Sequence, residues 1–185
     1  VVVSVFGGSV AVNAAGKEKY KSSYLQFAKQ QQKKTKKKLY YAIINASDGR
    51  MPVLLVTTAD AWMKSSKNAV YASVYSYSGS KVVHIAEMQS TGSGYPLLKN
   101  GEYIVSGWHH SSQRLKVSGA KGYMKSVDGF GMEHAKCHKK SWTIVDGKKK
   151  DFVSKNISQK KALSMDYYMN AYENGGKAIV FQKVK

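Results

Sequence analysis

The chain has 185 residues, with 30 Lys and Arg against 11 Asp and Glu, so its formal net charge is +19. This length and a hydrophobic content of 43% predict one domain with a single core and exclude an intrinsically disordered chain. The only cysteine, Cys137, excludes an internal disulfide framework, and no apolar run approaches the roughly 18 residues that a membrane-spanning helix needs.

Residues 1–15 carry no charge and read VVVSVFGGSVAVNAA. Within them, Val12 and Ala14 are spaced like the small residues before a signal-peptidase site, so the run resembles the end of a secretory signal peptide whose basic segment would lie upstream. We therefore expect residues 1–15 to be a signal-peptide remnant and 16–185 to be a single domain. The mature chain would start near Ala15 and be secreted or held at the cell surface. The alternative is an N-terminal strand, which a valine-rich run would suit.

The next segment, 17–38, has the spacing of an amphipathic helix. Tyr20, Tyr24 and Phe27 recur at intervals of four and three residues and form one apolar stripe. The segment ends in a run of lysines that would lie near the negative end of the helix dipole, namely Lys33, Lys34, Lys36, Lys37 and Lys38. We expect this run to bind polyanions. The alternative is an ordinary solvated helix end.

Two β-rich apolar runs, 39–44 and 53–58, flank a polar turn marked by Asp48 and Gly49, which predicts a β-hairpin. A lysine-rich helix followed by this hairpin resembles a segment of secreted and cell-surface proteins of Gram-positive, Clostridia-like bacteria, in which the loop reads D-x-D-G-D-G-x-P-E-L. In that family the loop looks like a calcium-binding turn, because closely spaced carboxylates supply the oxygen ligands that the ion prefers.

In this chain the loop is degenerate. The pattern's three aspartates are replaced in turn by Asn45, Ser47 and Gly49, while Pro52 and Leu54 match it. Because Asp48 is the only carboxylate left, we expect the shape of the loop to persist without a high-affinity calcium site. The resemblance covers 17–115 and returns from Val145, where a strand, Asp-Gly-Lys and a helix are similar to the closing elements of the same proteins.

Downstream, alternating apolar and polar residues predict a second hairpin, 70–77 with 81–88, around a Ser-Gly-Ser turn. Further short strands are expected at 95–98, 102–108, 114–118, 121–127, 141–145 and 177–184. Ser158 is expected to cap a final helix that ends near Glu173. The predicted fold class is α+β: a curved antiparallel β-sheet (meander) with an N-terminal and a C-terminal helix.

Few residues suggest catalysis. The sequence contains no phosphate-binding loop, dinucleotide fingerprint or nucleophile-elbow motif. A thiol and two imidazoles do lie within five residues, at His134, Cys137 and His138, but they are weak zinc candidates because neighbouring lysines would repel a cation. We expect no cofactor and no enzymatic activity. The alternative is a metal- or cysteine-dependent enzyme, which requires these three side chains to converge in a pocket.

A second group of candidate residues is aromatic. Tyr71, Tyr75 and Tyr77 occupy alternate positions of one predicted strand and would share a face, and Trp108 ends another strand. Tyrosine and tryptophan rings can stack on sugars or bases, so these four residues could form a binding platform. The alternative is that they fill a half-buried sheet.

The positive charge is almost entirely lysine, since Arg50 and Arg114 are the only arginines. Base recognition and bidentate phosphate binding favour arginine, whereas lysine is a hydrated point charge suited to diffuse attraction. We therefore predict a non-enzymatic, exported binding or structural module attracted to anionic cell-wall polymers or glycans. A non-specific nucleic-acid binder is a further alternative, and a surface that only keeps the protein dissolved is the simplest one. The sequence leaves the ligand and the oligomeric state open.

Overall fold

The computed structural model describes residues 8–45, 51–78, 81–90 and 94–185, with side chains described from Tyr20 onward. The helices are α1 (Gly8–Thr35), α2 (Gln159–Ser164) and α3 (Tyr167–Glu173). The strands of the first half are β1 (Leu39–Asn45), β2 (Pro52–Thr58), β3 (Trp62–Met63), β4 (Asn68–Ala69), β5 (Tyr71–Ser78) and β6 (Lys81–Gln89). Those of the second half are β7 (Leu98–Asn100), β8 (Tyr103–Trp108), β9 (Ser111–Ser118), β10 (Lys121–Asp128), β11 (Cys137–Val145), β12 (Lys148–Ile157), β13 (Lys177–Ala178) and β14 (Gln182–Lys183).

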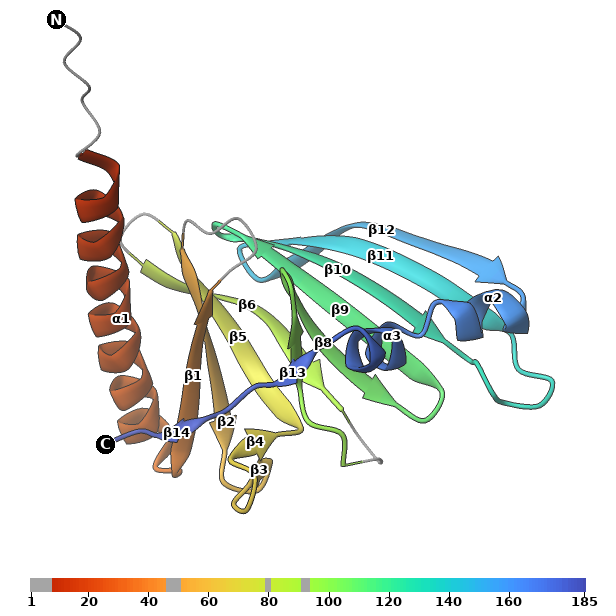
Figure 1. Ribbon diagram of the computed structural model, residues 1–185, viewed down its shortest axis with the longest axis horizontal. Coiled ribbons are helices and arrows are strands. Elements are labelled where there is room, and N and C mark those ends of the chain that lie inside the picture. The colour runs from red at the N-terminus through yellow and green to blue at the C-terminus, as the bar shows by residue number, and fades with distance from the viewer. Residues whose placement is uncertain (1–7, 46–50, 79–80, 91–93) are drawn as a thin grey trace, which may run out of the picture.

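Within the described residues, these strands form two main antiparallel sheets (Figure 1). The first sheet has five strands in the order β14-β1-β2-β5-β6, and the second has seven in the order β12-β11-β10-β9-β8-β7-β13, while β3 and β4 pair separately. The predicted α+β fold with antiparallel strands and a helix toward each end is confirmed. Both predicted hairpins form, as β1 with β2 and β5 with β6. The strands divide between two sheets, however, because the chain leaves β6 for a new sheet instead of continuing the meander.

The main core lies between the two sheets. Side chains on successive strand residues point to opposite faces, so every second residue of a strand can enter the same core. From the first sheet, Leu55 and Ile85 enter this core, and from the second sheet Leu115 and Ile144 do. All four are at most 5% exposed, which places them among the residues that contribute most to burial of apolar surface.

Helix α1 covers the other face of the first sheet. Strand β2 is apolar at consecutive positions, so Val53 and Leu55 face the main core while Leu54 and Val56 face α1. The predicted apolar stripe of α1 packs on this face of the sheet. Within the stripe, Tyr24 is fully buried, and its hydroxyl donates a hydrogen bond to the carbonyl of Pro52 at 2.8 Å. The described part of the chain contains no helix long and apolar enough to cross a bilayer.

The C-terminal helices cover one end of the second sheet's outer face, the face turned away from the main core. The single helix expected to start after Ser158 and end near Glu173 is interrupted, because Asp166 caps a new helix: its Oδ1 accepts from the backbone N–H of Tyr168 at 2.9 Å and of Met169 at 3.2 Å. Tyr168 then packs closely on β8. A Cβ placed on Gly107 would lie 2.5 Å from the Cβ of Tyr168, so glycine allows the close approach.

Strand β12 was not expected from the sequence. It pairs with β11 along its length and forms the free edge of the second sheet. Every side chain from Lys148 to Asn156 is exposed, so the strand has no apolar face to give a period-two signal. Charged residues are a common means of keeping such an edge from pairing with another chain.

The last predicted strand, 177–184, is two short strands that join different sheets. β13 pairs with β7 in the second sheet, and β14 pairs with β1 in the first. Between them, Ile179 and Phe181 are at most 4% exposed and enter the main core. This segment therefore links the two sheets across the core (Figure 1).

Candidate functional site

The three residues proposed for metal or thiol chemistry do not meet. Cys137 is 3% exposed and packs in an apolar cluster with Val127, Phe130 and Ala162. His138 is the next residue of the same strand and therefore points to the opposite face, whereas the side chain of His134 is 91% exposed. Among the described residues, no three His, Cys, Asp or Glu side chains are close enough to hold a metal ion. The three side chains therefore do not converge in a pocket, as a metal- or cysteine-dependent enzyme at this segment would require.

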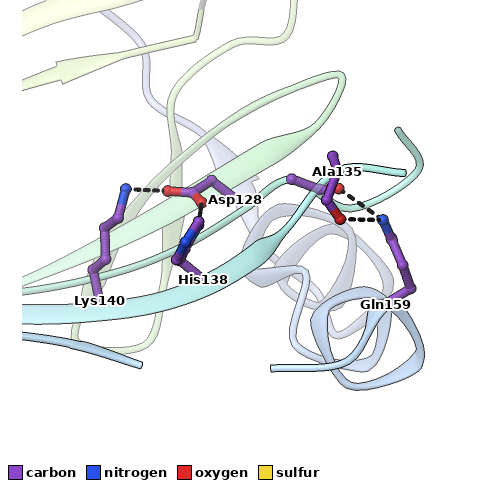
Figure 2. A network of polar contacts seen from close by, with 6 residues as sticks. Asp128, Ala135, His138, Lys140 and Gln159 are labelled. Atoms are coloured by element: carbon purple, nitrogen blue, oxygen red, sulfur yellow. Dashed lines mark hydrogen bonds and ion pairs between the residues drawn. The ribbon is translucent and has the colours of Figure 1, made fainter. Parts of the chain in front are cut away.

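His138 instead belongs to a cross-strand charge network (Figure 2). Asp128 on β10 lies opposite His138 in the sheet register, with 3.1 Å between its Oδ1 and the imidazole Nδ1. The Nζ of Lys140, two residues further on the same face, is 2.5 Å from Oδ2 of the same carboxylate. One carboxylate thus lies between an imidazole and an ammonium group at a partly exposed position, where an ion pair such as that with Lys140 contributes about 0–1 kcal/mol. Since Cys137 lies on the other face, the imidazole is not positioned to activate its thiol.

The loop before this network is held by one glutamine (Figure 2). The Nε2 of Gln159, at the start of α2, lies within hydrogen-bond distance of the carbonyls of Gly129, Met132 and Ala135, at 3.1, 2.9 and 3.4 Å. Its Oε1 accepts from the backbone N–H of Gly131 at 3.1 Å. The loop that carries His134 is therefore fixed by backbone contacts, while its charged side chains remain in solvent.

The predicted aromatic platform is divided between two sheets. Tyr71, Tyr75 and Tyr77 do share one face of β5, but that face lies under α1: the Tyr75 ring centroid is 4.9 Å from that of Phe27, and the Tyr77 centroid is 5.1 Å from that of Tyr20. The Tyr71 hydroxyl donates to the carboxylate of Glu87. Trp108 ends β8 in the second sheet. All three tyrosines are half-buried; Tyr75 and Tyr77 pack against α1, whereas Tyr71 contacts the neighbouring strand β6 through Glu87.

The predicted polyanion-binding lysines, which we call the helix-end cluster, are all exposed: Lys33, Lys34, Lys36, Lys37 and Lys38. The helix ends within this cluster because Lys36 has a left-handed backbone, with φ of 55°. The turn is fixed by Gln32, whose Oε1 accepts from the backbone N–H of Leu39 at 2.9 Å. The cluster therefore presents its charges from an ordered turn.

A second lysine surface, on the open part of the second sheet's outer face, was not identified from the sequence. We call it the lysine face; it consists of Lys116, Lys121, Lys125, Lys139, Lys148, Lys150 and Lys155. The sheet register brings them together: Lys121 and Lys148 both lie opposite Val145, and Lys139 lies opposite Lys155. The clue in the sequence was the four lysines of 148–155, which become informative only once that segment is known to be a strand.

Few acidic groups balance this face. The carboxylate of Glu102 lies 2.7 Å from the ammonium of Lys116, and the hydrogen bond from that ammonium is the largest cause of the lowered pKa of Glu102. Asp151 accepts a hydrogen bond from the Thr143 hydroxyl at 2.6 Å. The face is hollowed on its side toward β8, where a cavity of about 350 Å³ is lined by Tyr103, Arg114, Lys116, Ser118, Tyr123 and Lys125. This combination of cations, tyrosines and a shallow hollow can bind anions.

Comparison of the chain with protein-family models, with curated proteins and with solved structures finds no match.

Proposed function

We propose that this protein is a non-enzymatic module that binds an anionic polymer or glycan of the cell envelope through its lysine face. The observation that supports this most directly is β12, whose side chains from Lys148 to Asn156 are all exposed and whose lysines align with those of β10 and β11. An edge strand needs only a few charges to avoid aggregation. A continuous lysine surface across several strands exceeds that need and suits a polyanion.

The strands hold the charges of the lysine face at short, fixed intervals. Residues two apart on a strand are separated by about 6.6 Å and neighbouring strands by about 4.8 Å. Both distances are below the Debye length of about 8 Å at physiological salt, so the potentials of neighbouring lysines add. A flexible polyanion that lies across β9 to β12 would contact several of them at once and release the counterions that each had held.

The helix-end cluster is proposed as a second, weaker contact. Its five lysines are exposed and follow one another along a turn. Their charges repel one another, and a polyanion would relieve that repulsion. Because the cluster lies at the end of α1, outside the second sheet, the two surfaces can be removed separately by mutation.

The proposed location is the outside of the cell. Support comes from the uncharged run 1–15 and from the resemblance to secreted Gram-positive proteins. Tyr20, the first residue of the predicted apolar stripe, packs on Tyr77 and follows Ala15 in the chain, so cleavage near Ala15 would keep this stripe on the mature protein. Mass spectrometry of the protein from envelope fractions should find an N-terminal peptide that starts near Ala15. Finding residues 1–15 on protein that remains in the cytosol would contradict export.

The binding proposal is tested with two variants of equal charge loss. In the first, Lys121, Lys125, Lys148, Lys150 and Lys155 are replaced by glutamine; in the second, the five lysines of the helix-end cluster are. Affinity for a polyuronate is measured by isothermal titration calorimetry at several salt concentrations. We expect wild-type affinity to fall steeply with salt, and the first variant to weaken binding at least about tenfold and to lower the slope of log K against log salt by about three to five.

The second variant should weaken binding by no more than about threefold, because its lysines are not arranged along a sheet. Equal losses in both variants would show that only net charge matters and would contradict a defined binding face. Stronger binding to duplex DNA than to polyuronate at equal salt would favour the nucleic-acid alternative. No binding to either polymer at low salt would overturn the proposal.

A further inference from the structure

Arg114 stands apart from the lysines around it because its guanidinium is held between two tyrosine rings. Its Cζ lies 4.4 Å from the ring centroid of Tyr103 on β8 and 4.6 Å from that of Tyr167 on α3. Both rings are within cation–π distance of the planar group, an arrangement that leaves hydrogen bonding to the N–H donors at its edge. Resting on the function proposed above, we propose that Arg114 is the specific recognition site for one anionic sugar unit of the polymer.

The hydrogen bonding of Arg114 is incomplete within the described residues. Within the described part of the chain, its Nε is buried and makes no hydrogen bond, and no carboxylate lies within ion-pair distance of the guanidinium. Glu102, whose pKa is lowered mainly by its hydrogen bond from Lys116, is bound by that ammonium at 2.7 Å. A carboxylate or phosphate bound in a hollow that Arg114 lines would accept from its two Nη groups in the paired geometry that suits arginine.

Two hollows meet at this side chain. The first is the cavity of about 350 Å³ on the lysine face, and the second, of about 440 Å³, lies between the sheet and α3. Both are lined by Tyr103 and Arg114. These volumes fall in the range of small-molecule sites. A sugar unit in either hollow could therefore bring its charged group to the guanidinium.

The lining of the larger hollow is suited to hydroxyl groups. Three of its lining residues are asparagines, Asn100, Asn170 and Asn174. The Nδ2 of Asn170 donates to the Ser164 carbonyl at 3.2 Å and that of Asn174 to the Asn170 carbonyl at 2.7 Å, which leaves their Oδ1 atoms to accept from a ligand. Amide oxygens beside tyrosine rings and one arginine form a mixed surface that matches an anionic sugar better than a bare phosphate.

The competing explanation is that Arg114 is a brace that fastens α3 to the sheet. The two explanations differ in one observable, the response of the guanidinium to a small anion. Only Arg50 and Arg114 can give an arginine Nε–H signal in a ¹H–¹⁵N spectrum, and the spectrum of Arg114→Lys identifies which is which. The wild-type protein is titrated with glucuronate and with glycerol phosphate, and with glucose as the neutral control.

We expect the Arg114 Nε–H signal to shift and saturate with glucuronate, glycerol phosphate or both, and to stay unmoved with glucose. The stronger of the two anions then identifies the polymer class as carboxylate- or phosphate-bearing. If neither anion moves the signal, Arg114 is only a brace and the proposal is wrong. This titration uses no polymer and no variant for its readout, so its result is independent of the polymer test above.

The polymer arm compares three variants whose folding is checked by circular dichroism. Arg114→Lys keeps the charge but loses the paired donors, Arg114→Met loses both, and Lys148→Met removes one charge elsewhere on the lysine face. Affinity for polyuronate should fall at least about tenfold in both Arg114 variants and less than about threefold in Lys148→Met. Equal affinities of Arg114→Lys and wild type would overturn the inference while leaving the lysine-face proposal intact.

Discussion

The hydroxyl of Tyr24 makes a buried hydrogen bond between α1 and the first sheet. Its hydroxyl donates to the buried carbonyl of Pro52 at 2.8 Å, so Tyr24→Phe would leave that carbonyl without its donor. We expect a loss of about 1–2 kcal/mol in the free energy of unfolding, measured by urea denaturation. The matched control is Tyr41→Phe, whose hydroxyl makes an exposed 3.3 Å contact with Gln182 and should cost less than about 0.5 kcal/mol. Equal losses in the two variants would contradict the role given to Tyr24.

Buried tyrosines also predict how stability depends on pH. Burial is the largest cause of the raised pKa of Tyr24 and of Tyr168, because the phenolate form is poorly solvated there. In the unfolded chain these phenols ionise near pH 10, whereas the folded chain keeps them neutral, so above that pH the unfolded state releases more protons and is favoured. Stability should thus be unaffected by these groups below about pH 10 and fall above it, by up to about 1.4 kcal/mol per pH unit for each tyrosine.

The measurement is urea denaturation at several pH values between 8 and about 11.5. A Tyr24→Phe, Tyr168→Phe double variant should show a shallower fall than wild type at high pH, since two of the raised groups are gone. An identical slope in the two proteins would show that other groups control the alkaline transition.

At the scale of whole elements, Gln159 connects α2 to the loop before β11. Gln159→Ala removes contacts to four backbone groups between Gly129 and Ala135, so we expect a loss of about 1–2 kcal/mol and faster amide exchange confined to that loop. Hydrogen exchange followed by mass spectrometry measures this. Lys160→Ala, an exposed change on the same helix, should leave the loop unaffected. Faster exchange spread over the second sheet would contradict a local clamp.

A substitution in β8, the strand beneath α3, tests how closely that helix packs on the sheet. In Gly107→Ala the new methyl group would lie 2.5 Å from the Cβ of Tyr168, so α3 must shift, at a cost of about 1–3 kcal/mol in unfolding free energy. The neighbouring Ser106→Ala is the control, because the buried Ser106 Oγ has no hydrogen-bond partner in the described structure and its loss should be neutral or stabilising. Thermal denaturation distinguishes the two. A neutral Gly107→Ala would show that α3 is loosely seated.

The elements that could be predicted from the sequence are those whose side chains alternate between core and solvent. β5 has this pattern, with Ala72 and Val74 fully buried and polar or aromatic residues between them. β12 lacks it because both of its faces are exposed, and its position is set by pairing with β11 alone. The break before α3 depends on the capping carboxylate of Asp166, which a helical spacing of apolar residues does not reveal.

The candidate site was harder to predict than the fold. The helix-end cluster is contiguous in sequence and was identified at once, but the lysine face combines residues from β9 to β12 that only the register brings together. Arg114 was noted only as one of two arginines; its meaning depends on rings contributed by β8 and α3. Such a site is a tertiary arrangement, and no spacing rule along the chain describes it.

For the molecule as a whole, the net charge of +19 is a source of self-repulsion. Salt screens that repulsion, so the melting temperature should rise by about 2–4 °C when sodium chloride is increased from low to moderate concentration, which corresponds to about 1 kcal/mol for a chain of this size. The variant with five lysine-face glutamines should show a smaller rise, since fewer charges repel. A melting temperature that falls with salt would indicate that attractive ion pairs dominate instead. Differential scanning calorimetry provides the measurement.

The segment that carries β13 and β14 also affects when the molecule can fold. It supplies a strand to the edge of each sheet and places Phe181 in the core between them, so the packing of the two sheets is complete only when residues 177–184 are in place. During synthesis, every other described strand leaves the ribosome before this one. Closure of the core would therefore be a late step, in which one short segment completes the edges of both sheets at the same time.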